Sequence, residues 1–203
     1  MKFKPEHLSL YAITDSNCLR GRNLAEQVEQ AILGGVTCIQ LREKNLSTEK
    51  LAEEAKAILK ICRKHEVPLI INDDYKIAVE IGADGVHVGI EDAPVAEIRR
   101  FAGADFIIGA TAKTIEQARF AEESGADYIG VGAVFPSPTK KNAIRITPEQ
   151  LREICISVSI PAVAIGGITA ENVSAIKSCG QSGIAVVSAI FAADDVKAAA
   201  EKF

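Results

Sequence analysis

The sequence lacks the features that mark membrane, secreted and nucleic-acid-binding proteins. No apolar run approaches the roughly 20 residues that span a bilayer, and the opening segment MKFKPEH has no signal-peptide pattern. The net charge is −4 and the basic residues form no cluster, which argues against nucleic acid as the main partner. We therefore expect a cytoplasmic protein whose partners are neither a membrane nor a nucleic acid.

The sequence is also poor in groups for covalent hydrolysis and for soft metals. It has no Cys-x-x-Cys pair, and we expect its five widely spaced cysteines to be reduced thiols rather than catalytic or metal-binding groups. Of the three histidines, His7 and His65 lie near segment edges, whereas His87 alternates with valines and is expected to fill the protein interior. No Ser-His-Asp arrangement can be assembled, which disfavours a covalent hydrolase.

What the chain does contain is a regular alternation of short β-branched runs with longer segments of helical period. Eight strands are predicted, at 8–14, 37–42, 68–72, 85–89, 106–110, 128–134, 161–165 and 183–188. Helices between short apolar strands imply parallel pairing. We therefore expect residues 1–203 to form a single α/β catalytic domain, a (β/α)8 TIM barrel of minimal size. A doubly wound open sheet is the competing architecture.

Cap and turn residues mark the ends of several predicted helices. Thr114 with Gln117 and Thr147 with Gln150 have the spacing of capping boxes, and Thr169 is expected to open a later helix. A Gly-Ala-Asp sequence occurs at 82–84, 103–105 and 125–127. Each copy separates a helical pattern from a strand, as a glycine just beyond a helix end would.

Polar side chains gather where the predicted strands end, which in a TIM barrel is the face that carries the active site. They are Gln40, Arg42 and Lys44 after the second strand, Asn72 and Asp73 after the third, Glu91 and Asp92 after the fourth, Thr111 at the fifth, Ser137, Thr139 and Lys140 after the sixth, Gly166 and Gly167 after the seventh, and Ser188 near the eighth. For any single residue a solvated loop is an equally good explanation. The collection on one face favours a functional site.

Two of these residues suggest a metal ion. Asp73 and Asp92 come from consecutive strands, which would lie about 4.8 Å apart if paired. Both carboxylates could reach one cation, and hard oxygen ligands favour Mg²⁺ over zinc. Mg²⁺ held by one or two carboxylates usually also binds substrate phosphates. The sequence therefore predicts a Mg²⁺ cofactor and a diphosphate substrate.

Cationic and backbone groups supply matching sites for anions. Arg42, Lys44 and Lys140 bring positive charge, although each alone could be a solvated surface residue. Gly166 and Gly167 would let the backbone approach an anion closely, next to the N–H groups of the helix expected from Thr169. Phosphate sites after the last two strands are frequent in TIM barrels. Two anionic ligands are therefore expected at the same mouth.

The segment VFPSPTKK, at 134–141, follows a predicted buried strand. Pro136 and Pro138 fix the backbone of this loop. The restraint would let Lys140 and the hydroxyls of Ser137 and Thr139 face the reacting centre. A stiff solvent loop is the alternative.

Six motifs together resemble the thiamine phosphate synthase family, in the same order and over nearly the whole chain: QLREK, INDD, GADGVHVGIED, ADYIGVGAVFPSPTKK, PAVAIGGIT and GIAVVSAI. The resemblance implies a small (β/α)8 barrel transferase. Such an enzyme joins 4-amino-5-hydroxymethyl-2-methylpyrimidine diphosphate to hydroxyethylthiazole phosphate, forming thiamine phosphate and releasing diphosphate. It also implies a dissociative mechanism, in which diphosphate leaves first with the help of Mg²⁺ and the thiazole nitrogen captures the pyrimidine-methyl cation.

The resemblance assigns roles by position. It implies that the pyrimidine diphosphate contacts are Gln40, Arg42, Lys44, Asn72, Thr111 and Lys140, that the Mg²⁺ ligands are Asp73 and Asp92, and that the thiazole phosphate contacts are Ser137, Thr139, Gly167, Val187 and Ser188. Within this set the catalytic roles fall to Lys140, Arg42 and Thr111. No obvious general base is needed, because the departing anion requires neutralisation more than proton transfer.

Two other functions and the oligomeric state stay open at this point. A thiazole tautomerase shares the barrel and the phosphate end, but it tends to lack the paired carboxylates and to have histidine where this chain has Lys113. A non-catalytic regulator that binds thiamine phosphates is the other alternative. The chain also departs from the family pattern at Ile90, where glutamine is common. A homo-oligomer is compatible with the sequence.

Overall fold

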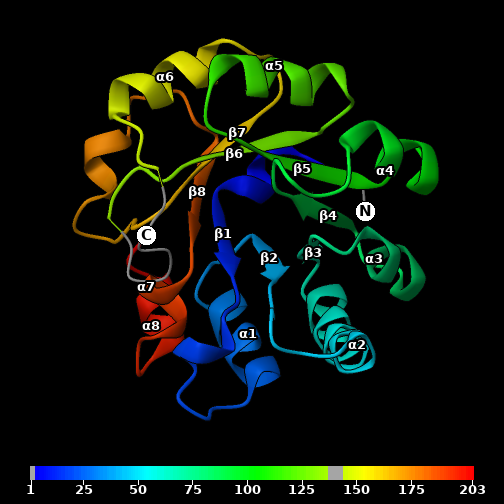
Figure 1. Cartoon of the computed structure of the whole chain (residues 1–203). Helices are drawn as coiled ribbons and strands as arrows, with labels where there is room; N and C mark the ends of the chain where they lie inside the picture. The colour runs from blue at the N-terminus through cyan, green and yellow to red at the C-terminus, as the bar shows by residue number, and fades with distance from the viewer. Residues whose placement is uncertain (1–2, 137–143) are drawn as a thin grey trace.

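Eight parallel strands form a closed barrel in which each strand pairs with its neighbours in sequence and β8 pairs with β1. The computed structural model describes residues 3–136 and 144–203. Helices surround the strands on the outside (Figure 1). The predicted TIM barrel is confirmed, and the open doubly wound sheet is excluded because its edge strands would be unpaired.

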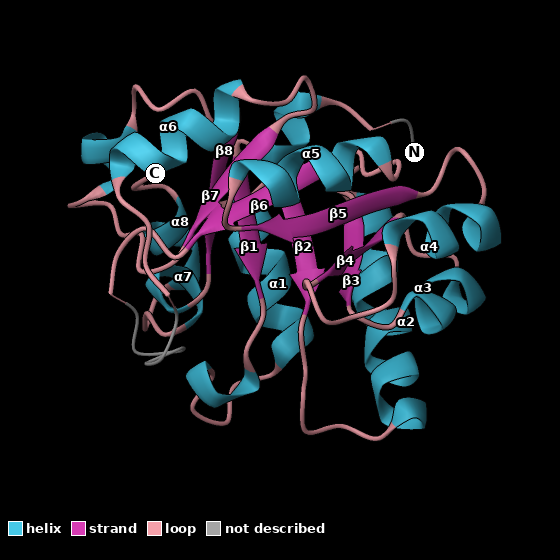
Figure 2. Ribbon diagram, turned by 45° about the horizontal axis from the view of Figure 1, so that its top comes forward, coloured by secondary structure: helices cyan, strands magenta, loops and turns pink. Residues whose placement is uncertain are grey.

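Every strand begins and ends within two residues of its predicted boundaries. They are β1 Leu10–Ile13, β2 Cys38–Leu41, β3 Leu69–Asn72, β4 Gly85–Val88, β5 Ile107–Ala112, β6 Tyr128–Gly132, β7 Ala162–Ile165 and β8 Gly183–Val186. The α-helices are α1 Leu24–Leu33, α2 Thr48–Lys64, α3 Tyr75–Ile81, α4 Val95–Ala102, α5 Ile115–Glu123, α6 Pro148–Ile156, α7 Ser188–Phe191 and α8 Val196–Ala200. Short 3-10 helices occupy Pro5–Leu8, Ser16–Cys18 and Val173–Ile176. Figure 2 distinguishes these helices from the central strands.

The strands carry two separate apolar clusters because their side chains alternate between the two faces of the sheet. One cluster fills the inside of the barrel and includes Tyr11, Ile70, Ile107, Tyr128 and Val163. A larger cluster packs the outer face of the strands against the helices. Burial on both sides explains why the strand sequences read as continuous apolar runs.

The predicted caps are confirmed in full at one helix and in part at another. Thr147 and Gln150 form both halves of a capping box at α6. At α5 the Thr114 side chain accepts a hydrogen bond from the Gln117 backbone N–H, as predicted. Gln117 Oε1 accepts from the Lys113 N–H at 2.8 Å instead of closing the box.

The prediction that a helix begins at Thr169 is wrong. A 3-10 helix, Val173–Ile176, begins four residues later. A hydrogen-bonded turn does begin at Thr169, whose carbonyl accepts from the Asn172 N–H at 3.2 Å and the Val173 N–H at 3.0 Å, but the chain continues as a 3-10 helix and not as an α-helix. Asn172 Oδ1 also accepts from the Thr169 N–H at 2.9 Å, as Gln150 does from Thr147 at α6, and its Nδ2 donates to the Gly167 carbonyl at 2.9 Å.

Two of the three Gly-Ala-Asp sequences fasten the amino ends of strands. Asp84 Oδ2 accepts from the Leu69 N–H at 2.9 Å, and its Oδ1 pairs with Arg63 Nη1 at 2.6 Å. In the same way, Asp127 Oδ2 accepts from the Ile108 N–H and pairs with Arg99 Nη2 at 2.7 Å. These pairs lie at the amino ends of the strands, the end of a TIM barrel associated with stability rather than chemistry.

The five cysteines are free thiols, as predicted. Burial raises the pKa of Cys62 to about 12 and that of Cys155 to about 11, so neither is a reactive thiolate at neutral pH. In the described part of the chain, no helix combines the length and the apolar character needed to cross a bilayer.

Candidate active site

The two carboxylates predicted as metal ligands face each other across paired strands. Asp73 follows β3 and Asp92 follows β4, and β3 pairs with β4 so that Asn72 lies opposite His87. Burial raises the pKa of Asp73, and the side chain of Asp92 raises it further as a hydrogen-bond partner and as a like charge. Two facing carboxylates repel each other, and a shared cation would remove the repulsion.

The backbone holds both acidic residues in place. Asp73 has a φ of 64°, a left-handed conformation in which non-glycine residues are uncommon. Its N–H donates to the His87 carbonyl at 2.9 Å, which fixes the turn against β4. Asp92 Oδ2 accepts from the Gly89 N–H at 2.7 Å. The strain at Asp73 and the anchored carboxylate of Asp92 are consistent with a functional site.

Three predicted residues come from β2 and the loop after it. Gln40 is only 3% exposed and points into the barrel, whereas Lys44 is exposed. The positive charge of Lys44 acts on Asp73 and partly opposes the rise in its pKa. The Arg42 N–H donates to Thr14 Oγ1 at 2.9 Å, and Thr14 Oγ1 donates to Glu43 Oε1 at 2.8 Å. These bonds tie the ends of β1 and β2 together beside the carboxylates.

Five side chains form a continuous series of hydrogen bonds through the barrel, which we call the interior chain. Gln40 Nε2 lies 2.8 Å from the Tyr11 hydroxyl, and that hydroxyl lies 2.9 Å from the hydroxyl of Tyr128. The Tyr128 hydroxyl lies 3.2 Å from His87 Nδ1, and His87 Nε2 lies 3.1 Å from Thr111 Oγ1. The chain joins two predicted substrate contacts, Gln40 and Thr111, and it confirms that the His87 side chain lies in the interior.

The middle of the interior chain is sealed from water. Tyr11 is 1% exposed and Tyr128 is 0% exposed. Burial raises the pKa of both phenols well above the ordinary tyrosine value, so both remain protonated at neutral pH. Each phenol therefore has one hydrogen to donate.

The loops after β6 and β7 touch through their backbones. The Phe135 N–H donates to the Gly166 carbonyl at 2.9 Å. Gly167 has a φ of 61°, and a Cβ there would collide with the backbone of Phe135 and Pro136. Only glycine meets both demands, which is why the backbone can turn so tightly at this mouth.

The remaining predicted phosphate contacts lie after β8. Val187 precedes α7, and Ser188 is its first residue. A short helix at this position is where TIM barrels frequently bind phosphate. The helix expected from Thr169 is absent from its predicted position, so α7 is the helix that fits this pattern.

Ser137, Thr139 and Lys140 lie outside the described residues, and so does Pro138. The described residues on either side are fixed at the barrel mouth. The Val134 N–H donates to the Ile165 carbonyl at 3.0 Å, and the Ile146 N–H donates to the Ala133 carbonyl at 3.0 Å. The roles of the three residues remain predictions.

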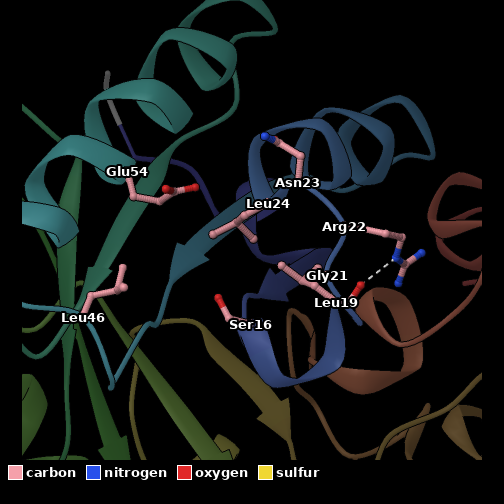
Figure 3. A pocket seen from close by; sticks show the side chains of 8 residues that line it. All are labelled: Ser16, Leu19, Gly21, Arg22, Asn23, Leu24, Leu46 and Glu54. Atoms are coloured by element: carbon pink, nitrogen blue, oxygen red, sulfur yellow. Dashed lines mark hydrogen bonds between the residues drawn. The ribbon is translucent and has the colours of Figure 1, made fainter.

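A surface cavity of about 320 Å³ lies beside the loop after β1 and is separate from these groups (Figure 3). The segment after β1 supplies most of its lining, and Leu46 and Glu54 supply the rest. Arg22, at its edge, donates to the Phe191 carbonyl at 2.7 Å and the Ala193 carbonyl at 2.6 Å, which ties the loop to the segment after α7. None of the described site residues lines this cavity, so we assign it no part in the chemistry.

Sequence reasoning missed Tyr11, Tyr128 and the link from His87 to Thr111. The available signal was the inward alternation along each strand, which puts Tyr11 in the barrel interior. A polar residue at an inward position needs a partner from another strand. Which strand supplies it depends on how far side chains reach across the barrel.

The described residues could supply only a small number of side chains to any one metal ion. No cluster of three or more His, Cys, Asp and Glu side chains is placed to hold a metal ion within residues 3–136 and 144–203. A pair of carboxylates is nevertheless what Mg²⁺ commonly takes from a protein, because it keeps several waters and binds substrate phosphates. Asp73 and Asp92 fit that pattern.

The fold and its mouth define a (β/α)8 barrel with a two-carboxylate site. The family model for thiamine monophosphate synthase matches residues 10–190. The chain belongs to that family. Thiamine-phosphate synthase of Clostridium tetani is 48% identical over 194 residues, covering 96% of this chain and 93% of that protein.

Two further relatives agree. Thiamine-phosphate synthase of Ruminiclostridium cellulolyticum is 48% identical over 202 residues, covering 100% of this chain and 96% of that protein. The solved structure of thiamine phosphate pyrophosphorylase from Pyrococcus furiosus superposes with a TM-score of 0.90 at 40% identity. It covers 98% of this chain and 94% of its own.

Proposed function

We propose that this protein is a thiamine-phosphate synthase. It transfers the pyrimidine-methyl group of 4-amino-5-hydroxymethyl-2-methylpyrimidine diphosphate to the nitrogen of hydroxyethylthiazole phosphate, and it releases diphosphate. The observation that carries the proposal is the convergence of Asp73 and Asp92 on paired strands beside Lys44. Relatives that match over almost their whole length, at 48% identity, have this name.

Asp73 and Asp92 would hold a Mg²⁺ ion. When bound, the ion supplies positive charge to the diphosphate oxygens as the C–O bond breaks. The raised pKa of Asp73 supports the assignment, because a cation in place of the proton would relieve the same repulsion.

The protein's own cationic and hydroxyl groups act on the diphosphate and the pyrimidine. Arg42 and Lys44 bind diphosphate oxygens, and Thr111 donates its hydroxyl hydrogen to them, with Lys140 as a further cation. Gln40 and Asn72 bind the pyrimidine end. Stabilisation of the leaving group in a preorganised site is the main source of rate in such a reaction.

The second substrate would be held by backbone groups. Gly167 would offer its backbone N–H to the phosphate, together with Val187 and Ser188 at the amino end of α7. Ser137 and Thr139 add hydroxyl contacts. The thiazole nitrogen then captures the pyrimidine-methyl cation, and no protein base is required.

A single assay tests the proposal. The purified protein is incubated with both substrates, with Mg²⁺ or with a chelator, and thiamine phosphate and free diphosphate are measured. We expect both products in equal amounts with Mg²⁺ and a large loss with chelator. Asp92→Ala should lower turnover by about 10²-fold or more. Conversion of the thiazole phosphate alone to an isomer would select the tautomerase, and binding without any conversion would select the regulator.

A further inference from the structure

The interior chain has a direction that its donors and acceptors determine. The amide nitrogen of Gln40 can only donate, so the Tyr11 oxygen is the acceptor of the first bond. Tyr11 then has one hydrogen left, and the Tyr128 oxygen lies 2.9 Å away. If Tyr11 donates there, Tyr128 is free to donate to His87 Nδ1.

The same count continues to the mouth of the barrel. A His87 ring that accepts at Nδ1 carries its hydrogen on Nε2 when neutral. That hydrogen points to Thr111 Oγ1 at 3.1 Å. Thr111 therefore accepts from His87 and keeps its own hydroxyl hydrogen for another partner.

The opposite direction of hydrogen donation satisfies the side chains of the interior chain less well. If Tyr128 donated to Tyr11, the Tyr11 hydrogen would have only the Cys38 sulfur as an acceptor, at a position that is 1% exposed. Sulfur is a weak acceptor, so this exchange would weaken a buried hydrogen bond. His87 would then have to donate to Tyr128, and Thr111 would spend its hydrogen on His87 Nε2, leaving only lone pairs to face an anion.

We propose that the interior chain runs in one direction, from Gln40 through Tyr11, Tyr128 and His87 to Thr111, and thereby fixes the Thr111 hydroxyl as a donor to the leaving diphosphate. Tyr11, Tyr128 and His87 are positioning residues, since they act through the two ends of the chain. The proposal rests on the proposed function only for the identity of the anion. The direction of the chain is a property of the free protein.

Two glycines leave the room that the chain needs. A Cβ at Gly109 would lie 2.5 Å from His87 Nδ1 and closer still to the phenol end of Tyr128. A Cβ at Gly130 would lie 3.0 Å from His87 Cε1. The rings of His87 and Tyr128 thus pack directly over bare backbone of β5 and β6. This packing restrains both rings and therefore the orientation of Thr111.

The first test is spectroscopic and needs no substrate. Nitrogen-15 NMR of protein labelled in histidine, with His87→Gln to assign the signal, reports which ring nitrogen carries hydrogen. We expect the hydrogen on Nε2 and a hydrogen-bonded acceptor at Nδ1. In Tyr128→Phe the Nδ1 signal should move to the position of an unbonded acceptor. A hydrogen on Nδ1 in the wild-type protein, or an unmoved Nδ1 signal in Tyr128→Phe, would overturn the proposal.

Two further tyrosine variants control this measurement. Tyr75→Phe removes a hydroxyl outside the chain, one that donates to Glu97 at 2.9 Å, and should leave the His87 signals unchanged. Tyr11→Phe should also leave Nδ1 hydrogen-bonded, because Tyr128 keeps its hydrogen. A loss of the Nδ1 bond in Tyr11→Phe would contradict the stated direction. If Tyr128→Phe does not fold, the wild-type spectrum and these variants still test the direction of the chain.

The second test asks whether Tyr128 acts through Thr111. We expect Tyr128→Phe to lower kcat by about 10-fold and Thr111→Val by about 10²-fold, and Thr111→Ser to lose less than Thr111→Val because it keeps a hydroxyl. In the Thr111→Val background, Tyr128→Phe should have no further effect on kcat. A further 10-fold loss there would show that Tyr128 acts independently and would overturn the positioning role. If no variant makes thiamine phosphate, the proposed function fails, while the NMR result still decides the direction of the chain.

Discussion

Replacing Gly109 by alanine tests how tightly the interior chain is packed. The added Cβ would meet three heavy atoms of Tyr128 and His87 at 2.5 Å or less. Tyr128 is fully buried, so its ring cannot swing into solvent to make room. Overpacking of a rigid core costs about 1–3 kcal/mol, and a contact with this many close atoms belongs at the upper end.

The net effect of this substitution on stability is smaller than the packing cost. Alanine in place of glycine restricts the unfolded chain, which stabilises the folded state by about 0.4–1 kcal/mol. We therefore expect Gly109→Ala to destabilise the protein by about 2 kcal/mol, which lowers Tm by roughly 4–8 °C in a domain of this size. Displacement of His87 and Tyr128 should also lower kcat by about 10-fold.

The assay is thermal unfolding by calorimetry together with steady-state turnover. Gly130→Ala is the matched control, because its Cβ would meet only His87, at 3.0 Å and 3.4 Å. Its packing cost and its entropic gain should nearly cancel, so that Tm changes by about 2 °C or less. If Gly109→Ala had the Tm and kcat of the wild type, the packing argument for the interior chain would be refuted.

Two other substitutions separate function from stability. Asp73→Asn should lower turnover by about 10²-fold or more. In the absence of Mg²⁺ it should raise Tm, because it removes a repulsion with Asp92, and it should abolish the rise in Tm that Mg²⁺ gives the wild type. A metal-free Tm below that of the wild type would contradict this. Because the Asp73 pKa is raised, the folded protein binds more protons than the unfolded chain at pH values between the ordinary and the raised pKa. The stability of the wild type should therefore fall as pH rises through that window. Urea titrations of Asp73→Asn should lack this pH dependence. Arg63→Ala should destabilise the protein by about 3 kcal/mol, because the Asp84 side chain is 0% exposed and would lose its guanidinium, while kcat of the folded fraction stays unchanged; a change in kcat at unchanged stability would refute the structural role.

The sequence predicted the barrel because its information is local and periodic. Each strand carries its own apolar run, and each helix its own repeat and cap, as Thr147 and Gln150 show. The pairing of β3 with β4 then follows from the order of the strands. The convergence of Asp73 and Asp92 could thus be anticipated without any knowledge of distances.

The errors and omissions concern features that depend on three-dimensional detail. Thr169 begins a hydrogen-bonded turn that Asn172 caps, but the chain continues only as the 3-10 helix Val173–Ile176. Tyr11 and Tyr128 are 117 positions apart, and their contact depends on ring size and on the space above Gly109. No local pattern encodes that combination.

The most direct test of the central claim is a crystal structure of the protein with Mn²⁺ and inorganic diphosphate, in which Mn²⁺ replaces Mg²⁺ and is located by its anomalous scattering. We predict one strong anomalous peak between the carboxylates of Asp73 and Asp92, with diphosphate oxygens completing the coordination and Thr111 within hydrogen-bond distance of the anion. A metal ion bound elsewhere, or a diphosphate bound away from these two carboxylates, would contradict the account.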